Sequence, residues 1–507
     1  MNEKDIKEKL LGLPDIEIEE RKRIRSDYYF YKGKSPDLEK AKDDPATIGQ
    51  NWEIDDNVDY KPTQDIRNKV KPLLKKQARF MFGKEPTITF KPNDLKDKEK
   101  CEELRKFIDD VFENNKFWKN TRKAFLMSTI KKRVLLRVEA NPGMPVKIKY
   151  ENIEDFYYKE VDGTLVEVGL FEADRNNIFV EKEDDKIYHL HIYFYKSLEE
   201  DKSPVAWYRK KTYKGNDLEK PIKSEENPTG FDQISCWLIK NGGELNDTFG
   251  ESDLEDLKDI QNQYNRRISD FADALRFQLF GADSVIDGDP EDVNNMKVAP
   301  GAIHAIRTRK DAAEGIKATH QRLEYNFGSS EAINSFLDRA TQDMNFVLDM
   351  PALKDLANIP SAKAMKYLYN DLIARCEEKW NDWEPIFKDL IDFIIESSKY
   401  CYGGRFKEEW RTLDYTTVFA HNYPLPSDEE DKKKLALDEV EKFTRSIRSY
   451  MKEYSNEEDP EKAFKEIVKE VKVLNEARMA DSFQEGINRE LDEEDLKKDK
   501  EDKAGEE

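Results

Sequence analysis

The segment from Ser252 to Leu279 constrains the fold of this chain more than any other part of its sequence. Apolar side chains recur there at steps of three or four residues, and most positions between them are polar or charged. This spacing predicts one helix, about 42 Å long at 1.5 Å per residue. A narrow apolar seam on a long polar helix cannot cover itself, so we expect a partner helix. The seam consists of Leu257, Ile260, Tyr264, Ile268, Phe271 and Leu275.

Two more long helices are predicted further along the chain. Ser329–Asp349 has apolar residues at helical spacing, and a third helix opens at Pro360-Ser361. Trp380 and Trp383 lie three residues apart in that third helix. They therefore share one helical face, which favours packing in a core over stacking on bases.

The first half of the chain mixes two periodicities. Helical spacing is seen at Thr63–Gly83, Glu99–Asn115 and Phe117–Ile130. From Arg133 to about Cys236 the period changes to two, with Gly, Asn, Pro and acidic clusters between the alternating runs. Helices followed by an antiparallel meander indicate an α+β fold.

Shorter elements are expected in the rest of the chain. Residues 281–328 read as a compact insert with strand-like pieces at Ser284–Ile286 and Ala302–Ile306. A strand is predicted at Thr412–Phe419, and one helix from Ser427 to about Tyr454. The last 17 residues hold nine acids and four bases without an apolar face, so we expect a disordered tail.

Composition limits the class of partner. The formal net charge is −21, whereas proteins that grip nucleic acid usually carry a basic stripe. No run of 18 apolar residues or secretory signal is present, so we expect no membrane contact and a cytoplasmic site of synthesis. The four cysteines form no C-x-x-C pair. His189 and His191 share one face of a predicted strand and read as solvated surface.

The motif search predicts neither a catalytic site nor a cofactor or metal site. Phosphate-loop, dinucleotide-binding, nucleophile-elbow and H-E-x-x-H patterns are all missing from the sequence. The acids between Asp253 and Asp259 could imitate a metal-dependent nuclease, but on a long helix they read as solvated surface. A coiled-coil scaffold remains the alternative from a different class, with a DNA-processing enzyme less favoured.

Two stretches resemble portal proteins of tailed bacteriophages, of the siphophage type from Gram-positive hosts. The first runs from Gly250 to Asp270, with Ser252-Asp253-Leu254, Tyr264-Asn265 and Ser269-Asp270 in the order of that family's stem helix. The second, Pro360-Ser361-Ala362-Lys363-Ala364-Met365-Lys366, resembles the opening of the helix after the family's tunnel loop. The resemblance spans about Arg67 to Tyr454.

The resemblance implies an α+β, portal-type architecture with a mixed wing, long stem helices, a small α/β clip and a helical C-terminal crown. Its expected parts are a wing (1–249), a first stem helix (250–280), a clip (281–328), a second stem helix (329–350), a tunnel loop (351–359), a wing helix and return strand (360–426), a crown (427–480) and an acidic tail (481–507).

The function implied is that of a head-to-tail connector, which is not an enzyme. Portals form rings, usually of twelve subunits, at one capsid vertex of the virion, after assembly in the host cytoplasm. Double-stranded DNA is packaged through the ring by a separate terminase and later ejected, without sequence-specific contacts. The implied partners are further copies of the chain, the terminase large subunit, a head-completion adaptor, and the major capsid and scaffolding proteins.

Three groups of residues would then carry the function. The charge of the ring would matter for all of them. Twelve chains of charge −21 would total −252, and an acidic wall keeps moving DNA from sticking.

The first group is the tunnel loop, whose residues would line the channel, with Lys354 centring the duplex; they are Lys354, Asp355 and Asn358. A basic clip patch would dock the terminase or adaptor, or would pair with acids of the neighbouring subunit; it comprises Arg307, Arg309 and Lys310. The apolar seam would pack between stem helices of the ring.

Overall fold

The computed structural model describes most of the chain. The described residues are 3–33, 49–51, 60–197, 204–245, 247–280, 282–296, 305–323, 330–351, 362–425, 429–454, 459 and 461–475. They form two compact units, one built from residues 1–360 and 364–424 and the other from 361–363 and 425–507.

Helices dominate the first unit. Their bounds are α1 (Glu3–Leu11), α2 (Asp15–Lys32), α4 (Val70–Phe82), α5 (Lys98–Asn114), α6 (Phe117–Lys131), α7 (Glu255–Phe280), α8 (Pro290–Asn294), α9 (Ser330–Val347), α11 (Ala362–Leu368) and α12 (Asn370–Cys401). Short 3₁₀ turns are η2 (Leu95–Asp97), η3 (Ile153–Asp155), η4 (Arg175–Phe179), η5 (Glu183–Asp185) and η6 (Glu408–Thr412).

All described strands pair antiparallel. The larger sheet has the order β4 (Phe156–Val161), β5 (Thr164–Ala173), β6 (Ile187–Lys196), β7 (Val205–Lys214) and β8 (Lys223–Pro228). A second sheet has the order β3 (Lys147–Asn152), β2 (Arg133–Glu139) and β9 (Cys236–Lys240). The remaining pairs are β1 (Thr87–Pro92) with β12 (Tyr415–Ala420), and β10 (Ala282–Ile286) with β11 (Thr319–Leu323). The predicted α+β class is confirmed.

An aromatic core holds the helical part of this unit together. Trp380 and Trp383 of α12 are both buried, as their spacing predicts. They surround Phe82 at the end of α4, with ring centroids 5.0 and 5.6 Å from its ring. Phe125 of α6 closes the cluster from the other side, 5.5 Å from Phe82. Because α12 contributes to this core, it ties the late part of the chain to its first half.

The sheets have their own apolar layers. Ile24 of α2 packs in a cluster with Leu135 of β2 and Phe156 of β4. Ile6 of α1 packs with Ile192 of β6 on the larger sheet. The alternation seen in the sequence is therefore the pattern of a sheet with buried and exposed faces.

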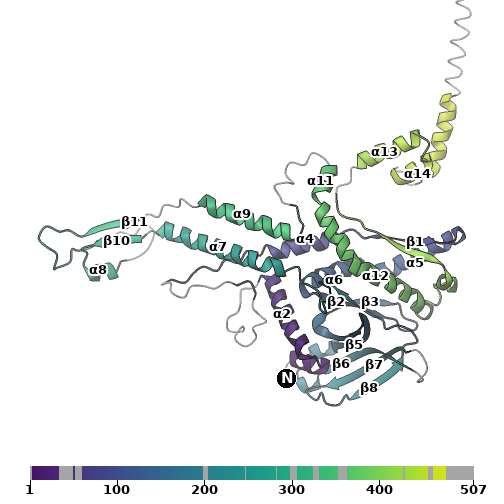
Figure 1. Cartoon of the computed structure of the whole chain (residues 1–507), viewed down its shortest axis with the longest axis horizontal. Coiled ribbons are helices and arrows are strands. Elements are labelled where there is room, and N and C mark those ends of the chain that lie inside the picture. Colours follow the sequence, from purple (N-terminus) through teal and green to yellow (C-terminus); the bar gives the residue numbers. More distant parts are fainter. Residues whose placement is uncertain are drawn as a thin grey trace, which may run out of the picture. The chain divides into compact units, whose positions relative to one another are not determined.

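The helix pair α7 and α9 is the feature that the seam predicts. The two helices pack against each other, and the β10–β11 hairpin follows at their far ends (Figure 1). Met344 of α9, Leu348 directly after that helix and Leu257 of α7 are completely buried. The partner helix that the seam needs is thus supplied, over much of its length, by the same chain.

Three predictions of secondary structure are wrong. Residues 63–69 form neither a helix nor a strand, and α4 begins only at Val70. In the insert, the strand that pairs with β10 is Thr319–Leu323. Ala305 and Ile306, the described part of the predicted strand, are not in one, and Ala302–His304 lie outside the described residues.

The third correction concerns the second unit. Where one helix was predicted from Ser427 to Tyr454, there are two, α13 (Glu429–Glu441) and α14 (Ile447–Tyr454). Phe443 between them has φ 56°, a left-handed conformation that ends a helix. A further helical stretch covers residues 461–475. The acidic tail beyond lies outside the described residues.

Candidate functional site at the base of the α7–α9 helix pair

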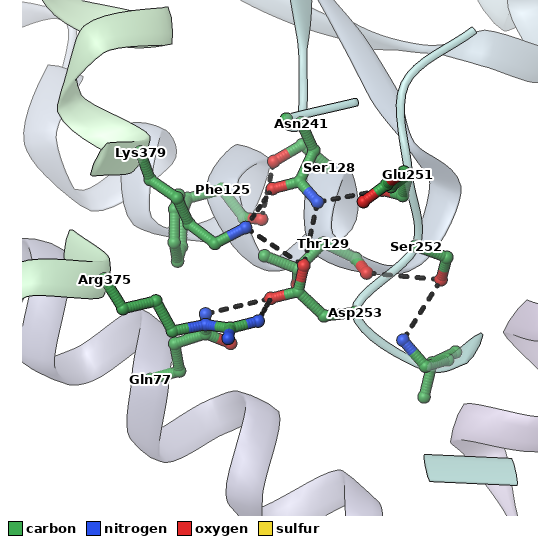
Figure 2. A network of polar contacts seen from close by, with 12 residues as sticks. Gln77, Phe125, Ser128, Thr129, Asn241, Glu251, Ser252, Asp253, Arg375 and Lys379 are labelled. Carbon is green, nitrogen blue, oxygen red and sulfur yellow. Dashed lines mark hydrogen bonds and ion pairs between the residues drawn. The ribbon is translucent and has the colours of Figure 1, made fainter. Parts of the chain in front are cut away.

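The start of α7 is anchored by a buried polar network around Asp253 (Figure 2). One carboxylate oxygen accepts hydrogen bonds from Lys379 Nζ at 3.0 Å and from Asn241 Nδ2 at 2.9 Å. The other accepts from Gln77 Nε2 at 2.9 Å and lies 3.3 Å from Arg375 Nη2. Four separate parts of the chain therefore meet at one side chain: α4, the end of β9, α12 and the residues before α7.

Asp253 is not the solvated acid that the sequence indicated. Its side chain is only 5% exposed, although it opens an acidic stretch. Burial alone would raise its pKa, but the charges of Lys379 and Arg375 outweigh burial and hold the pKa below its ordinary value. Both cations come from α12, four residues apart, and Lys379 is itself buried. The sequence contained one indication that a buried acid would be needed there: two basic residues, Arg375 and Lys379, lie beside the apolar stripe of that helix.

The backbone before Asp253 is fixed by neighbouring residues. Gly250 has φ +79°, and a Cβ there would stand 2.9 Å from the Lys132 carbonyl oxygen, so only glycine fits. The Ser252 hydroxyl donates to the Ile130 carbonyl oxygen at 3.0 Å, and the Asp253 N–H donates to the Thr129 carbonyl oxygen at 2.9 Å. These bonds satisfy carbonyl groups at the end of α6 that would otherwise lack partners.

Arg375 extends the network to the end of α9. Its Nη1 donates to Asp349 Oδ2 at 3.1 Å and to the Val347 carbonyl oxygen at 3.3 Å. Asp349 has φ 54° directly after the helix, where glycine is usually favoured. One guanidinium group thus connects the first residues of α7 with the last residues of α9.

A second set of polar contacts runs along α7 itself. Four side chains at intervals of four residues are buried and form hydrogen bonds with the extended segment 63–69: Gln261, Asn265, Ser269 and Asp273. The N–H groups of Lys69, Arg67, Asp65 and Thr63 donate to them in turn, at 2.9, 3.1, 2.9 and 2.9 Å. We call this set of four pairs the polar ladder.

The polar ladder follows from a match of two repeats. Four residues of an α-helix rise about 6.0 Å, and two residues of an extended chain rise about 6.6 Å. A side chain at every fourth helical position can therefore meet every second residue of an extended partner. The segment contributes four backbone N–H groups and one side chain, the Thr63 hydroxyl, which donates to Asp273 Oδ1 at 2.5 Å. Because the contacts are mostly to the backbone, the sequence of the segment gives little sign of the pairing. A signal for the pairing was present on α7, where a polar residue recurs at every fourth position from Gln261 to Asp273, and sequence reasoning missed it.

The six seam residues do not share one environment. Leu257, Tyr264 and Ile268 are buried within the single chain. Ile260 and Phe271 are half-buried, and Leu275 is 39% exposed. The apolar surface left for contact with another molecule lies toward the far end of α7. It includes Phe277, which is 40% exposed and lies edge-on to Tyr60 at 4.9 Å.

The predicted basic patch of the insert is largely neutralised by its own chain. Arg307 holds Asp292 with two guanidinium hydrogen bonds of 2.9 and 2.8 Å, and these hold the pKa of Asp292 at about 2. Arg309 Nε lies 3.5 Å from Asp287. Lys310 is exposed, and no ion pair involves it in the described part of the chain. The tunnel-loop residues Lys354, Asp355 and Asn358 lie outside the described residues.

The histidine pair is less solvated than expected. His191 is buried, with Nδ1 2.6 Å from the Tyr208 hydroxyl oxygen and Nε2 3.4 Å from Glu172. His189 lies 3.3 Å from Asp174. Within the described ranges, no group of three or more His, Cys, Asp or Glu side chains is arranged to hold a metal ion. No helix among those residues is both long and apolar enough to cross a bilayer.

These features define a class of protein: an α+β body that carries a firmly anchored helix pair with a small hairpin at its tip. Residues 12–476 match the family model described as "Phage portal protein, SPP1 Gp6-like". The chain therefore belongs to this portal protein family, and the resemblance read from Gly250–Asp270 and Pro360–Lys366 is confirmed.

Two further comparisons concern solved structures and curated proteins. A solved chain described as "Neck of native GTA particle computed with C12 symmetry" is similar to this chain, with 10% sequence identity and a TM-score of 0.39. The alignment covers 75% of this chain and 87% of the solved one. No curated protein matches the sequence. The chain is a phage portal protein by family, with the connector role of that family.

Proposed function

We propose that the chain forms a ring, of twelve subunits, around a channel at one capsid vertex. Double-stranded DNA would enter through this channel, driven by the terminase large subunit, and leave through it at ejection. The observation that carries this proposal is the α7–α9 pair, which is anchored at one end by the Asp253 network and followed at the other by the β10–β11 hairpin. In the portal reading, α7 and α9 are the stem and residues 281–328 the clip.

The charge of the chain supports passage of DNA over tight binding. Each subunit carries −21, and Arg307 and Arg309 of the insert are paired with acids of the same chain. A wall with an excess of acids and few unpaired cations binds DNA phosphates weakly. We retain Lys354, Asp355 and Asn358 as proposed channel residues, and Lys310 as the clip cation most available to an adaptor or terminase.

The proposed role needs no catalysis by this chain. The family is one of structural proteins, and translocation would draw its energy from the terminase, so we expect neither nucleotide hydrolysis nor DNA cleavage by the purified protein. The remaining proposed parts are a wing (1–249 and 360–426), a tunnel loop (351–359) and a crown (427–480). Capsid and scaffolding proteins are the proposed partners around the ring.

Size-exclusion chromatography with light scattering tests the ring directly. The expected particle has about twelve times the 59.6 kDa subunit mass, and negative-stain microscopy should show a central hole. A coiled-coil scaffold would give about twice the subunit mass. If the protein stays monomeric at high concentration and in low salt, the ring proposal fails.

A further inference from the structure

A groove lies between the α1–α2 turn and the larger sheet. Its volume is about 630 Å³, within the range of sites that hold a drug-sized ligand or a few residues of peptide. One wall is the turn from Leu10 to Glu17, and the other includes Tyr157–Glu160 of β4 with residues of β6 and β7. It lies apart from the Asp253 network and from the proposed stem.

The groove is strongly apolar along the turn. Leu10, Leu13 and Ile16 line it on one side, and Ile192 and Phe249 on the other. Ile16 is 68% exposed although it lies in the first turn of α2. Ile16 therefore presents an apolar side chain to solvent beside the apolar wall of the groove.

Three cations and two carboxylates line the groove: Arg21, Lys159 and Lys211, with Glu17 and Glu160. Glu160 pairs with Lys240 at 2.8 Å. Glu17 receives two cations: Arg21 Nε lies 2.9 Å from it, and Arg133 Nη2 lies 2.8 and 2.9 Å from its two oxygens. Arg133 is completely buried, and its Nε has no hydrogen-bond partner among the described residues. The Tyr158 hydroxyl beside it also lacks a partner there. Arg21 and Arg133 therefore share the carboxylate of Glu17, and Arg21 also donates to the Phe156 carbonyl oxygen at the edge of β4.

The rim adds a further cation. Lys211 of β7 lines the groove, and no ion pair involves it in the part of the chain that the structure describes. Lys159 also lines the groove, and its partner Glu167 lies 3.1 Å away. The groove therefore combines an apolar wall with an excess of positive charge, in a chain whose total charge is −21.

The shape of the wall favours an extended peptide. Four consecutive residues of β4 line the groove, and among the described strands β4 pairs only with β5. It is an edge strand, and such strands present backbone groups that an added extended segment can bind. We propose that this groove is a docking site for an extended, acidic and apolar peptide segment of a partner protein. The carboxylates of the segment would face Lys211 and Arg21, and its apolar side chains would lie against Ile16 and Phe249.

Fluorescence anisotropy on the full chain tests the proposal with three labelled octapeptides. One alternates leucine and glutamate, one leucine and lysine, and one serine and glutamate. We expect saturable binding of the leucine–glutamate peptide, and binding at least about ten-fold weaker for the other two, since each lacks one of the two complementary features. Equal binding of the leucine–lysine peptide would overturn the charge argument. Failure of the leucine–glutamate peptide to bind would overturn the proposal.

Matched variants locate the site. Lys211→Glu and Ile16→Asp should each weaken binding of the leucine–glutamate peptide about ten-fold. Lys210→Glu is the control for charge, because adjacent residues of a strand point to opposite faces of the sheet. Ile178→Asp is the control for an exposed isoleucine, since Ile178 is 85% exposed outside the groove. Binding that is unchanged in both groove variants, with normal circular dichroism, would overturn the assignment to this groove.

Discussion

At the scale of single residues, Asp253 shows how a buried ionic network can specify a position without adding much net stability. Replacing a whole buried ion cluster with apolar side chains is often neutral, whereas removing one partner leaves an uncompensated charge. Asp253 has two cationic partners, and Arg375 also reaches Asp349. The network therefore fixes where α7 and α9 start and end, and its members should be sensitive to single substitutions.

Lys379→Met tests this sensitivity. The substitution removes the hydrogen bonds of Lys379 to Asp253 and Asn241, and we expect a loss of about 3 kcal/mol in the free energy of unfolding. Lys388→Met in the same helix is the control, because Lys388 is 42% exposed and pairs with Glu384 on the helix surface; about 0.5 kcal/mol or less is expected. Chemical denaturation measures both. Equal losses in the two variants would contradict the role given to the network.

The pH dependence of stability gives a second test at this scale. The pKa of Asp253 is lowered in the folded chain, so its ionised form favours folding at every pH above its unfolded value of 3.8. That contribution is lost as the pH falls from there through the folded pKa. In the double variant Asp253→Asn/Lys379→Met the unfolding free energy should fall less steeply below pH 3.8. Identical slopes for the variant and the parent chain would show that Asp253 is not paired as described.

At the scale of elements, the polar ladder makes α7 the template for an extended segment. Asn265 is central to it: Oδ1 accepts from the Arg67 N–H at 3.1 Å and from Gln261 at 2.8 Å, and Nδ2 donates to Gln50 at 2.8 Å. Asn265→Ala would leave these buried groups without partners. We expect a loss of about 2–3 kcal/mol and faster hydrogen exchange at the amides of residues 63–69.

The neighbouring position supplies the control for the polar ladder. Arg266→Ala changes an exposed residue of the same helix turn, so the stability should change by about 0.5 kcal/mol or less. Exchange at residues 63–69 should then remain as in the parent chain. If Asn265→Ala leaves that exchange unchanged as well, the ladder does not hold the segment in solution.

The same elements show what the sequence could and could not predict. The seam of α7 and the strands from β2 to β7 were predicted from local periodicity. The strands are present, although β2 is buried on both faces and does not alternate in burial. Residues 63–69 were misread because Ile66 and Val70 lie at helical spacing, while the bonds that hold the segment extended come from residues about 200 positions away. Asp253 was misread for a related reason: its cationic partners lie on α12, beyond any local pattern.

At the scale of the whole molecule, the burial of each seam residue determines which apolar side chains are left to contact other subunits. Leu257, Tyr264 and Ile268 are buried within one chain, so a charge at Ile268 would damage the subunit as well as any ring. Leu275 and Phe277 on α7, with Phe336 and Phe346 on α9, remain exposed. These apolar side chains lie on helices whose positions the Asp253 network fixes. We propose them as the surface on which neighbouring subunits would pack.

Leu275→Asp is the corresponding test of assembly. Leu275 is 39% exposed, so the subunit should fold normally, while a carboxylate in an apolar contact between subunits would be left without a partner. Light scattering should show loss of the ring for this variant and an intact ring for Ile178→Asp, which introduces the same charge at an exposed isoleucine of η4. Circular dichroism should be unchanged in both variants. If Leu275→Asp assembles as well as Ile178→Asp does, the far end of α7 does not lie between subunits, and the contacts of the ring must come from another face of the chain.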